Sequence, residues 1–137
     1  MGARRKAREL ALQMLYQHDL SGNSVETIID TFEELQKANP STREFATMIL
    51  HGTVKNLAQI DEMITAQADN WRLSRMAVVD RNIIRMSIYE FLHQNDTPKL
   101  VIIDEAIEIA KKFGTVKSPP FINGILDGIL KRYNLAS

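Results

Sequence analysis

The sequence predicts an all-α protein, and three observations lead to this fold class. Apolar residues recur three and four positions apart along most of the 137 residues, whereas the strict alternation that is typical of strands is hard to find. Glycines, prolines and capping side chains divide the chain at intervals that suit helices. A hydrophobic content of 45% is enough to build a sizeable core, and the length is that of one ordinary domain.

The first quarter of the chain predicts two helices. The first covers residues 4–18 and stops at the turn pair at 21–22, where a serine precedes a glycine. Either Asn23 or Ser24 can cap the second helix, because both side chains accept a hydrogen bond from a free backbone N–H. This helix ends before the asparagine and proline at 39–40.

A third helix begins at a capping box. Ser41 and Glu44 have the Ser-x-x-Glu spacing, in which each side chain can satisfy the free backbone N–H of the other residue at a helix start. The apolar pattern then continues to about residue 66. These three helices form a predicted N-terminal bundle over about 1–68, and a linker at 69–74 follows it.

The rest of the chain, about 74–137, predicts a C-terminal bundle. Helical periodicity resumes over 76–92 and is interrupted by a turn at 95–98. The segment "VIIDEAIEIAKKFG" follows, with Gly114 as its C-cap, and the proline pair at 119–120 opens the last helix, where a missing N–H costs nothing.

The charges sum to zero but are distributed unevenly. Residues 1–18 hold four basic and one acidic side chain, residues 19–72 hold four and nine, and residues 73–137 hold nine and seven. Basic ends around an acidic middle can form a basic patch without making the whole protein basic. This pattern suits selective binding of an anionic polymer, and it leaves an acidic region for a second partner.

Several classes of protein are not supported by the sequence. Without cysteine there are no disulfides, thiolate metal sites or cysteine nucleophiles, which fits a cytoplasmic location. Apolar runs such as 100–103 are much shorter than the roughly 20 residues that span a bilayer, and the N-terminus lacks the apolar region of a secretion signal. We therefore expect neither membrane insertion nor secretion.

Catalytic motifs are also hard to find. Glu90 and His93 have the spacing that carboxylate-bridged di-iron bundles use, but such bundles need a second copy of the motif. There is no phosphate-binding loop, dinucleotide glycine fingerprint or Gly-x-Ser-x-Gly elbow. We expect no enzyme activity, no metal, no cofactor and no small-molecule substrate; a carboxylate–metal enzyme stays as a hypothesis that elemental analysis would test.

The start of the first helix is the first candidate binding site. Four cations, at Arg4, Arg5, Lys6 and Arg8, lie where the helix dipole disfavours each of them by roughly 0.3–1 kcal/mol. Beside the expected core stripe, Arg5, Arg8 and Tyr16 share a flank within an arc of roughly 80°. Guanidinium groups grip phosphates and a tyrosine ring can stack on a base, as single-stranded RNA recognition requires. The alternative is a solubilising N-terminus with Tyr16 partly in the core. The expected core stripe consists of Ala7, Leu10, Ala11, Met14 and Leu15.

A second candidate lies between the last two helices. Phe113 ends one helix and Phe121 follows the proline pair, so that two aromatic residues bracket a loop that carries Lys117. Such a loop can offer both stacking and phosphate contacts. Taken singly, each phenylalanine is more often a core residue.

Four segments together resemble the family of the bacterial transcription antitermination factor NusB. They are "ARRKARELALQMLYQ", "DRNIIRMSIYEF", "IDEAIEIAKKFG" and "FINGILDGILKRY", in order and over nearly the whole chain. The resemblance implies about seven helices in two packed three-helix bundles. It also implies a protein that pairs with NusE, the ribosomal protein S-ten, to bind the boxA element of nascent RNA. That complex joins RNA polymerase and opposes termination, chiefly on ribosomal RNA operons.

The resemblance also implies roles for particular residues. The "DRNIIRMSIYEF" helix, with Asp80, Ile84 and Tyr89, matches the side of the family that docks the ribosomal protein. The loop departs from the family at Lys117, where an acidic or polar residue is frequent, and a lysine there is expected to strengthen backbone contacts at some cost in selectivity. The positions that match the RNA side are Arg4, Arg5, Lys6, Arg8, Tyr16, Phe113 and Phe121.

Two alternatives to this function stay open at this stage. One is a protein-only helical adaptor or oligomer that does not bind RNA. Salt distinguishes it, since phosphate contacts weaken steeply with ionic strength and an apolar protein interface does not. The other is the related helical domain that begins some RNA cytosine methyltransferases, but 137 residues leave no room for the cofactor-binding domain to which it is fused.

Overall fold

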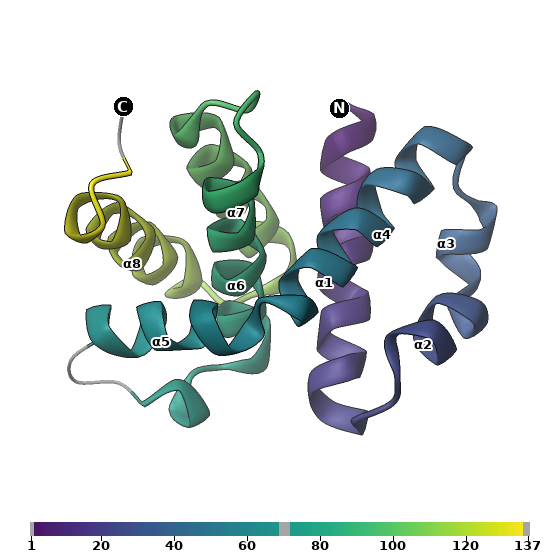
Figure 1. The fold of residues 1–137 in the computed structure, drawn as a ribbon, viewed down its shortest axis with the longest axis horizontal. Coiled ribbons are helices and arrows are strands. Elements are labelled where there is room, and N and C mark those ends of the chain that lie inside the picture. Colours follow the sequence, from purple (N-terminus) through teal and green to yellow (C-terminus); the bar gives the residue numbers. More distant parts are fainter. Residues whose placement is uncertain (1, 69–71, 136–137) are drawn as a thin grey trace. The chain divides into compact units, whose positions relative to one another are not determined.

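The structure, a computed structural model, describes residues 2–68 and 72–135, and every regular element in these ranges is a helix (Figure 1). The predicted all-α class is therefore confirmed. The chain divides into two compact units, residues 1–55 (unit 1) and 56–137 (unit 2). Within the described ranges, no helix combines the length and the apolar character needed to cross a membrane.

Unit 1 is built around two long helices that lie side by side, α1 and α4 (Figure 1). The shorter α2 packs against both of them. All five residues of the predicted core stripe on α1 are buried, so the helical period identified this face correctly. The helices of unit 1 are α1 (Ala3–Ser21), α2 (Val25–Thr31), α3 (Glu33–Lys37) and α4 (Pro40–Lys55).

Local chemistry explains where α1 ends and where α2 begins. Gly22 adopts the left-handed conformation, with φ at 71°, and its N–H donates to the carbonyl oxygen of His18 over 3.0 Å, as the predicted turn requires. Ser24 caps α2, since its Oγ accepts a hydrogen bond from the N–H of Thr27 at 3.1 Å. The predicted single helix is nevertheless interrupted at Phe32, whose backbone is extended and whose ring is buried.

The cap of α4 differs from the predicted one. Asn39, not Ser41, is the capping residue, because Asn39 Oδ1 accepts the N–H of Thr42 at 2.9 Å. Pro40 is the first helical residue, a position where its missing N–H leaves no hydrogen bond unmade. The predicted capping box of Ser41 and Glu44 is therefore wrong, since the helix already includes both residues.

The described residues of unit 2 form four α-helices and one short 3-10 helix. Helix α7 packs against α6 and α8, and α5 packs against the same two helices (Figure 1). Helix α6 is buried on every face over residues 82–91, which makes it the most enclosed element of the unit. The elements are α5 (Leu57–Gln67), η1 (Leu73–Arg75), α6 (Val78–His93), α7 (Lys99–Phe113) and α8 (Ser118–Arg132).

The units divide the chain one helix earlier than the predicted boundary at 69–74. The predicted third helix ends at Lys55, and its continuation is the separate helix α5, which belongs to unit 2. The guanidinium of Arg85 explains this placement, because its Nε and Nη2 donate to the two carboxylate oxygens of Asp61 at 2.8 and 3.0 Å. This paired geometry ties α5 to α6. The first residues of the predicted linker, 69–71, lie outside the described residues.

In the loop between α7 and α8, the backbone of Gly114 lies close to the side chain of Ser118. Gly114 has a φ of −99°, so its conformation does not require glycine. A Cβ atom at this position, however, would lie 2.5 Å from Ser118 Oγ. That hydroxyl accepts the N–H of Thr115 at 3.0 Å and so closes the turn. Pro119 and Pro120 follow in the first turn of α8, as predicted.

Candidate nucleic-acid interface

The cations of α1 begin a helix whose first turn contains no acidic residue. Gly2 is its N-cap and provides no side-chain cap, although its carbonyl oxygen accepts the N–H groups of Arg5 and Lys6 at 3.2 and 3.4 Å. Arg4 and Lys6 are exposed, and Arg5 is half-buried. The structure therefore keeps at least two of the predicted cations on the surface despite their unfavourable place on the helix dipole.

The predicted flank of Arg5, Arg8 and Tyr16 is confirmed only in part. Tyr16 is 40% exposed, so its ring is accessible rather than buried in the core. Arg8 is only 4% exposed, and the prediction that it offers its guanidinium to RNA does not agree with this burial. Instead, its Cζ lies 5.4 Å from the centre of the Phe45 ring. Position 8 faces α4 because it lies next to the core stripe on the helix.

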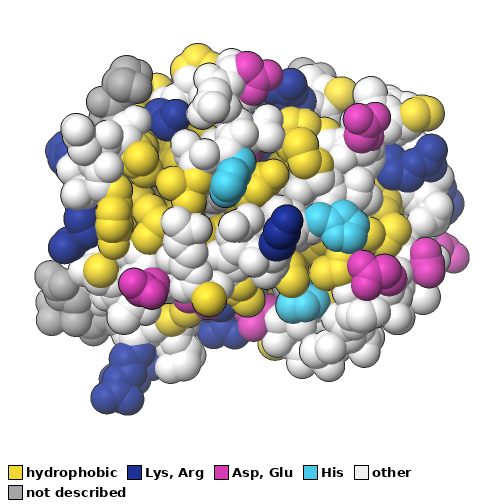
Figure 2. Space-filling model, in the orientation of Figure 1, with side chains coloured by type: hydrophobic (Ala, Val, Ile, Leu, Met, Phe, Trp, Pro, Cys, Tyr) yellow, Lys and Arg dark blue, Asp and Glu magenta, His cyan; other side chains and the backbone are white. Residues whose placement is uncertain are grey.

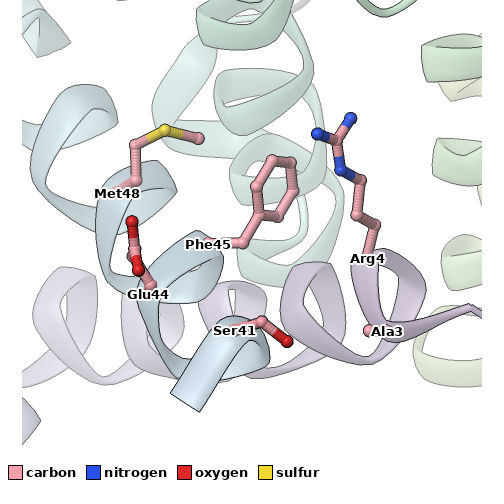
Figure 3. A pocket seen from close by; sticks show the side chains of 6 residues that line it. All are labelled: Ala3, Arg4, Ser41, Glu44, Phe45 and Met48. Carbon is pink, nitrogen blue, oxygen red and sulfur yellow. The ribbon is translucent and has the colours of Figure 1, made fainter. Parts of the chain in front are cut away.

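A cavity of about 360 Å³ lies between the start of α1 and α4 within unit 1 (Figure 3). Figure 3 shows the Phe45 ring between Met48 and Arg4, with Ser41 and Glu44 on the α4 side. The Cζ of Arg4 lies 4.7 Å from the centre of that ring, which is within the range of a cation–π contact. The lining residues are Ala3, Arg4, Ser41, Glu44, Phe45 and Met48.

A second cavity, of about 260 Å³, lies in unit 2. It brings together Lys117 and Phe121, the two loop residues that the sequence singled out, and adds Asp80 from the first turn of α6. Asp80 Oδ1 is buried and has no hydrogen-bond partner among the described residues. Buried acceptors without a partner are rare in folded proteins, which sets this carboxylate apart. The lining residues are Arg75, Met76, Ala77, Asp80, Lys117 and Phe121.

Phe113 lies at the end of α7 and is half-buried. The Nζ of Lys112 lies 5.5 Å from the centre of its ring, so an aromatic face and a cation meet at this helix end as well. Lys117 is exposed in the loop that follows. The structure therefore shows two separate pairs near this loop, Lys112 with Phe113 and Lys117 with Phe121.

Most of the residues predicted to dock a protein partner are buried in unit 2. Ile84 is 0% exposed and Tyr89 is 8% exposed, both within the enclosed stretch of α6. The Tyr89 ring stacks on His93, with the two ring centres 5.0 Å apart. Ile84 therefore belongs to the core and cannot touch a partner at the surface, because α6 is covered on every face. Asp80 is the partly exposed member of the predicted set.

Two residues of these cavities escaped the sequence analysis. Phe45 fitted the apolar pattern of its helix, and Arg75 lies between the predicted linker at 69–74 and the predicted helix at 76–92. A signal for the first was present, because Arg4 and Arg8 are four residues apart on one helix and can meet a single ring of a neighbouring helix. Nothing in the local sequence indicated that Phe45 would provide that ring.

The basic side chains on the face drawn in Figure 2 are separated from one another. On the face seen in Figure 2, lysine and arginine side chains are scattered among apolar and uncharged ones. This agrees with the net charge of zero. A nucleic acid would therefore meet separate contacts on this face rather than a uniform basic field.

Comparison with known proteins gives consistent results. The family model described as the NusB family matches residues 5–131. The transcription antitermination protein NusB of Trichlorobacter lovleyi is 50% identical over 127 residues, which cover 93% of this chain and 89% of that protein.

Solved structures agree with the sequence relatives. The structure of T. maritima NusB has a TM-score of 0.85 and 40% identity, with 93% of this chain and 90% of that chain covered. A structure of the antitermination factors NusB and NusE in complex with double-stranded RNA has a TM-score of 0.86 and 26% identity, with 96% and 98% covered. The likeness therefore extends over both units.

Proposed function

The chain belongs to the NusB family, and from this membership we propose that it is a transcription antitermination factor. It binds boxA-type single-stranded RNA together with NusE, the ribosomal protein S-ten. The complex joins RNA polymerase in the cytoplasm and opposes termination, chiefly on ribosomal RNA operons. The protein acts by binding and not as an enzyme.

The observation that carries this proposal is the cavity of unit 2. Lys117 can neutralise a phosphate, and the ring of Phe121 can stack on a base that has left the RNA helix. Asp80 adds an acceptor, Oδ1, that has no hydrogen-bond partner among the described residues. Base amino groups are donors that a carboxylate can read, as it does with cytosine. These three side chains supply charge, stacking and base recognition at one place.

Unit 1 supplies the second set of contacts. Arg4 and Lys6 are exposed and can meet phosphates, and Tyr16 offers an accessible ring. Arg5 is half-buried and keeps part of its side chain at the surface. Arg8 is buried and does not contact RNA directly; its guanidinium packs on the ring of Phe45.

The partner protein makes binding tight. A chain with zero net charge, one cation-rich helix start and one loop with a lysine can meet only a few phosphates at these two sites, too few for high affinity at physiological salt. A partner with its own basic surface extends the path of the RNA, and joining two weak sites raises the overall affinity. We assign the docking of NusE to unit 2 by the match of the α6 motif, in which Ile84 and Tyr89 are buried and support the helix instead of contacting the partner.

The test is an RNA titration with and without the partner. A boxA-like single strand, a scrambled strand and a duplex are each titrated into the protein alone and into an equimolar mixture with NusE, at two salt concentrations. We expect modest, salt-sensitive binding by the protein alone and tight binding selective for the boxA-like strand in the mixture. Equal affinities in both samples, with no association between the proteins, would leave the protein-only helical adaptor as the better hypothesis.

A further inference from the structure

The ring of Phe45 has two arginine side chains of α1 as neighbours. The Cζ atoms of Arg4 and Arg8 lie 4.7 and 5.4 Å from its centre. We propose that Phe45 is a positioning residue of the RNA-binding surface of unit 1, which holds the guanidinium of Arg4 ready for a phosphate. This inference rests on the proposed function, since it concerns how Arg4 is oriented before it contacts RNA.

Burial assigns different roles to the three side chains. Arg8 is 4% exposed and Phe45 is half-buried, so both belong to the support. Arg4 lies one turn closer to the N-terminus and is exposed. The ring, carried by α4, thus contacts two guanidinium groups of α1, and only the outer one is accessible to a ligand.

Stacking and phosphate binding use different parts of a guanidinium. The flat face lies against an aromatic ring, whereas the N–H donors point outward in the plane of the group. A stacked arginine therefore keeps the edge that binds a phosphate. Because an arginine on a free helix end samples many rotamers, contact with a fixed ring reduces the entropy that is lost when RNA binds.

The composition of the neighbouring cavity favours a supporting role for Phe45 and does not favour a pocket that encloses a nucleotide. Glu44 lines the same cavity as Arg4 and would repel a phosphate that entered deeply. The phosphate is therefore expected at the outward edge of the Arg4 guanidinium, with the Phe45 ring behind it. Figure 3 shows the guanidinium of Arg4 beside the ring and away from the carboxylate.

A double-mutant cycle tests the proposal with the full chain and NusE present. The variants are Phe45→Leu, Arg4→Ala, their combination and Phe45→Tyr, and the ligand is a boxA-like single-stranded RNA. We expect Phe45→Leu to weaken binding about threefold, the size of an exposed cation–π contact. It should leave the salt dependence unchanged, because no phosphate contact is removed. Phe45→Tyr, which keeps the aromatic face, should bind like the wild type.

The Arg4 variants and the double mutant distinguish a positioning role of Phe45 from a purely structural one. Arg4→Ala should reduce the slope of log K against log salt by about 0.7, as for one phosphate on a single strand. Adding Phe45→Leu to Arg4→Ala should weaken binding no further. Arg4→Lys keeps the charge but loses the flat face, so it should resemble Phe45→Leu, and it tests the proposal even where Phe45→Leu fails to fold.

The possible failures can be told apart. Independent, multiplicative losses from Arg4→Ala and Phe45→Leu would overturn the positioning role, because the ring would then act without the arginine. A loss with Arg4→Ala but none with Phe45→Leu or Arg4→Lys would overturn it too, and the RNA-binding function would stand. If no variant of Arg4, Arg5 or Lys6 affects RNA binding, the assignment of RNA contacts to unit 1 fails as well.

Discussion

Both units place an aromatic ring beside basic side chains, but the two rings have different surroundings. In unit 1 the ring of Phe45 contacts the guanidinium groups of Arg4 and Arg8. In unit 2 the ring of Phe121 lines a cavity of about 260 Å³ together with Lys117. The same combination of residue types therefore lies against buried and exposed arginines in one unit and borders an open cavity in the other.

This difference shows that burial decides the role of a cation more than its place in the sequence does. Arg8 belongs to a conspicuous basic cluster, yet it is 4% exposed and acts inside the protein. Lys117 is a single lysine in a short loop, yet it is exposed at the edge of a cavity. An aromatic residue near a basic one thus predicts a stacking site only when the structure leaves room beside the ring.

The largest expected effect is that of Arg8→Glu on stability. A carboxylate would replace a buried guanidinium beside Phe45, and we expect the free energy of unfolding to fall by about 3 kcal/mol. The matched control is Arg4→Glu, an exposed change in which the gain from the helix dipole opposes the lost contact with Phe45, so it should stay within about 1 kcal/mol of the wild type. Urea denaturation measures both, and equal stabilities would contradict the distinction between the inner and the outer arginine.

In unit 2, Gly114→Ala should disturb the loop that carries Lys117. The new Cβ would meet Ser118 Oγ at 2.5 Å, and we expect a loss of about 2 kcal/mol in the free energy of unfolding. Gly124→Ala on α8 is the control, because open space surrounds that position, and it should gain about 0.5–1 kcal/mol. Thermal or urea denaturation of both variants checks the sign of each effect, and a stable Gly114→Ala would show that the loop can relax.

Phe121→Leu sharpens the comparison of the two rings. Loss of a base-stacking face should weaken RNA binding by roughly 1–2 kcal/mol. The same change at Phe45 should cost less, because that ring acts through an arginine. Titrations with a boxA-like strand in the presence of NusE measure both variants, with helical content as the control. Equal losses at the two positions would remove the proposed difference between the units.

Asp80→Asn tests base recognition in the cavity of unit 2. Asp80 Oδ1 has no hydrogen-bond partner among the described residues, so the change should lower the free energy of unfolding by no more than about 1 kcal/mol, the size of the lost interaction between the carboxylate and the start of α6. Discrimination between boxA-like and scrambled RNA should fall by about 1 kcal/mol, the size of one hydrogen bond. Binding of the scrambled strand should not weaken, because a negative charge near phosphate is removed. An unchanged ratio of the two affinities would show that Asp80 does not read a base.

The smallest expected effect is that of Lys117→Glu on salt dependence. Loss of one phosphate contact should reduce the slope of log K against log salt by about 0.7, with a change in stability within about 0.5 kcal/mol. Lys131→Glu is the control, since Lys131 is exposed on α8, pairs with Asp127 and does not line the cavity. Equal slopes for wild type and Lys117→Glu would assign this lysine to solvent.

The sequence predicted those features that depend on neighbours along the chain. Gly22 ends α1 and Ser24 caps α2, because both act on backbone groups within four residues. The prolines at 119 and 120 begin α8 for the same reason, as their missing N–H groups are tolerated only at a helix start. The core stripe of α1 followed from the helical period alone.

Predictions failed where a distant segment determined the result. Phe32 interrupts a predicted helix while its ring is buried, and α5 joins unit 2 through the contact of Asp61 with Arg85. Ile84 resembled a docking residue by its place in a motif, but helices α5, α7 and α8 pack against its helix. In each case the partner lies many residues away, and no local pattern indicates it.

By itself, then, the sequence determined the helical class, most helix ends and the positions of the basic side chains along each helix, since these depend on backbone geometry and on side-chain chemistry within a few residues. Only the tertiary structure decided that Arg8 is buried against Phe45 and that Asp80, Lys117 and Phe121 share one cavity. The reason is physical: exposure and proximity result from the packing of helices that are far apart in the chain, and the helical period shows which face is apolar but not which residue it meets.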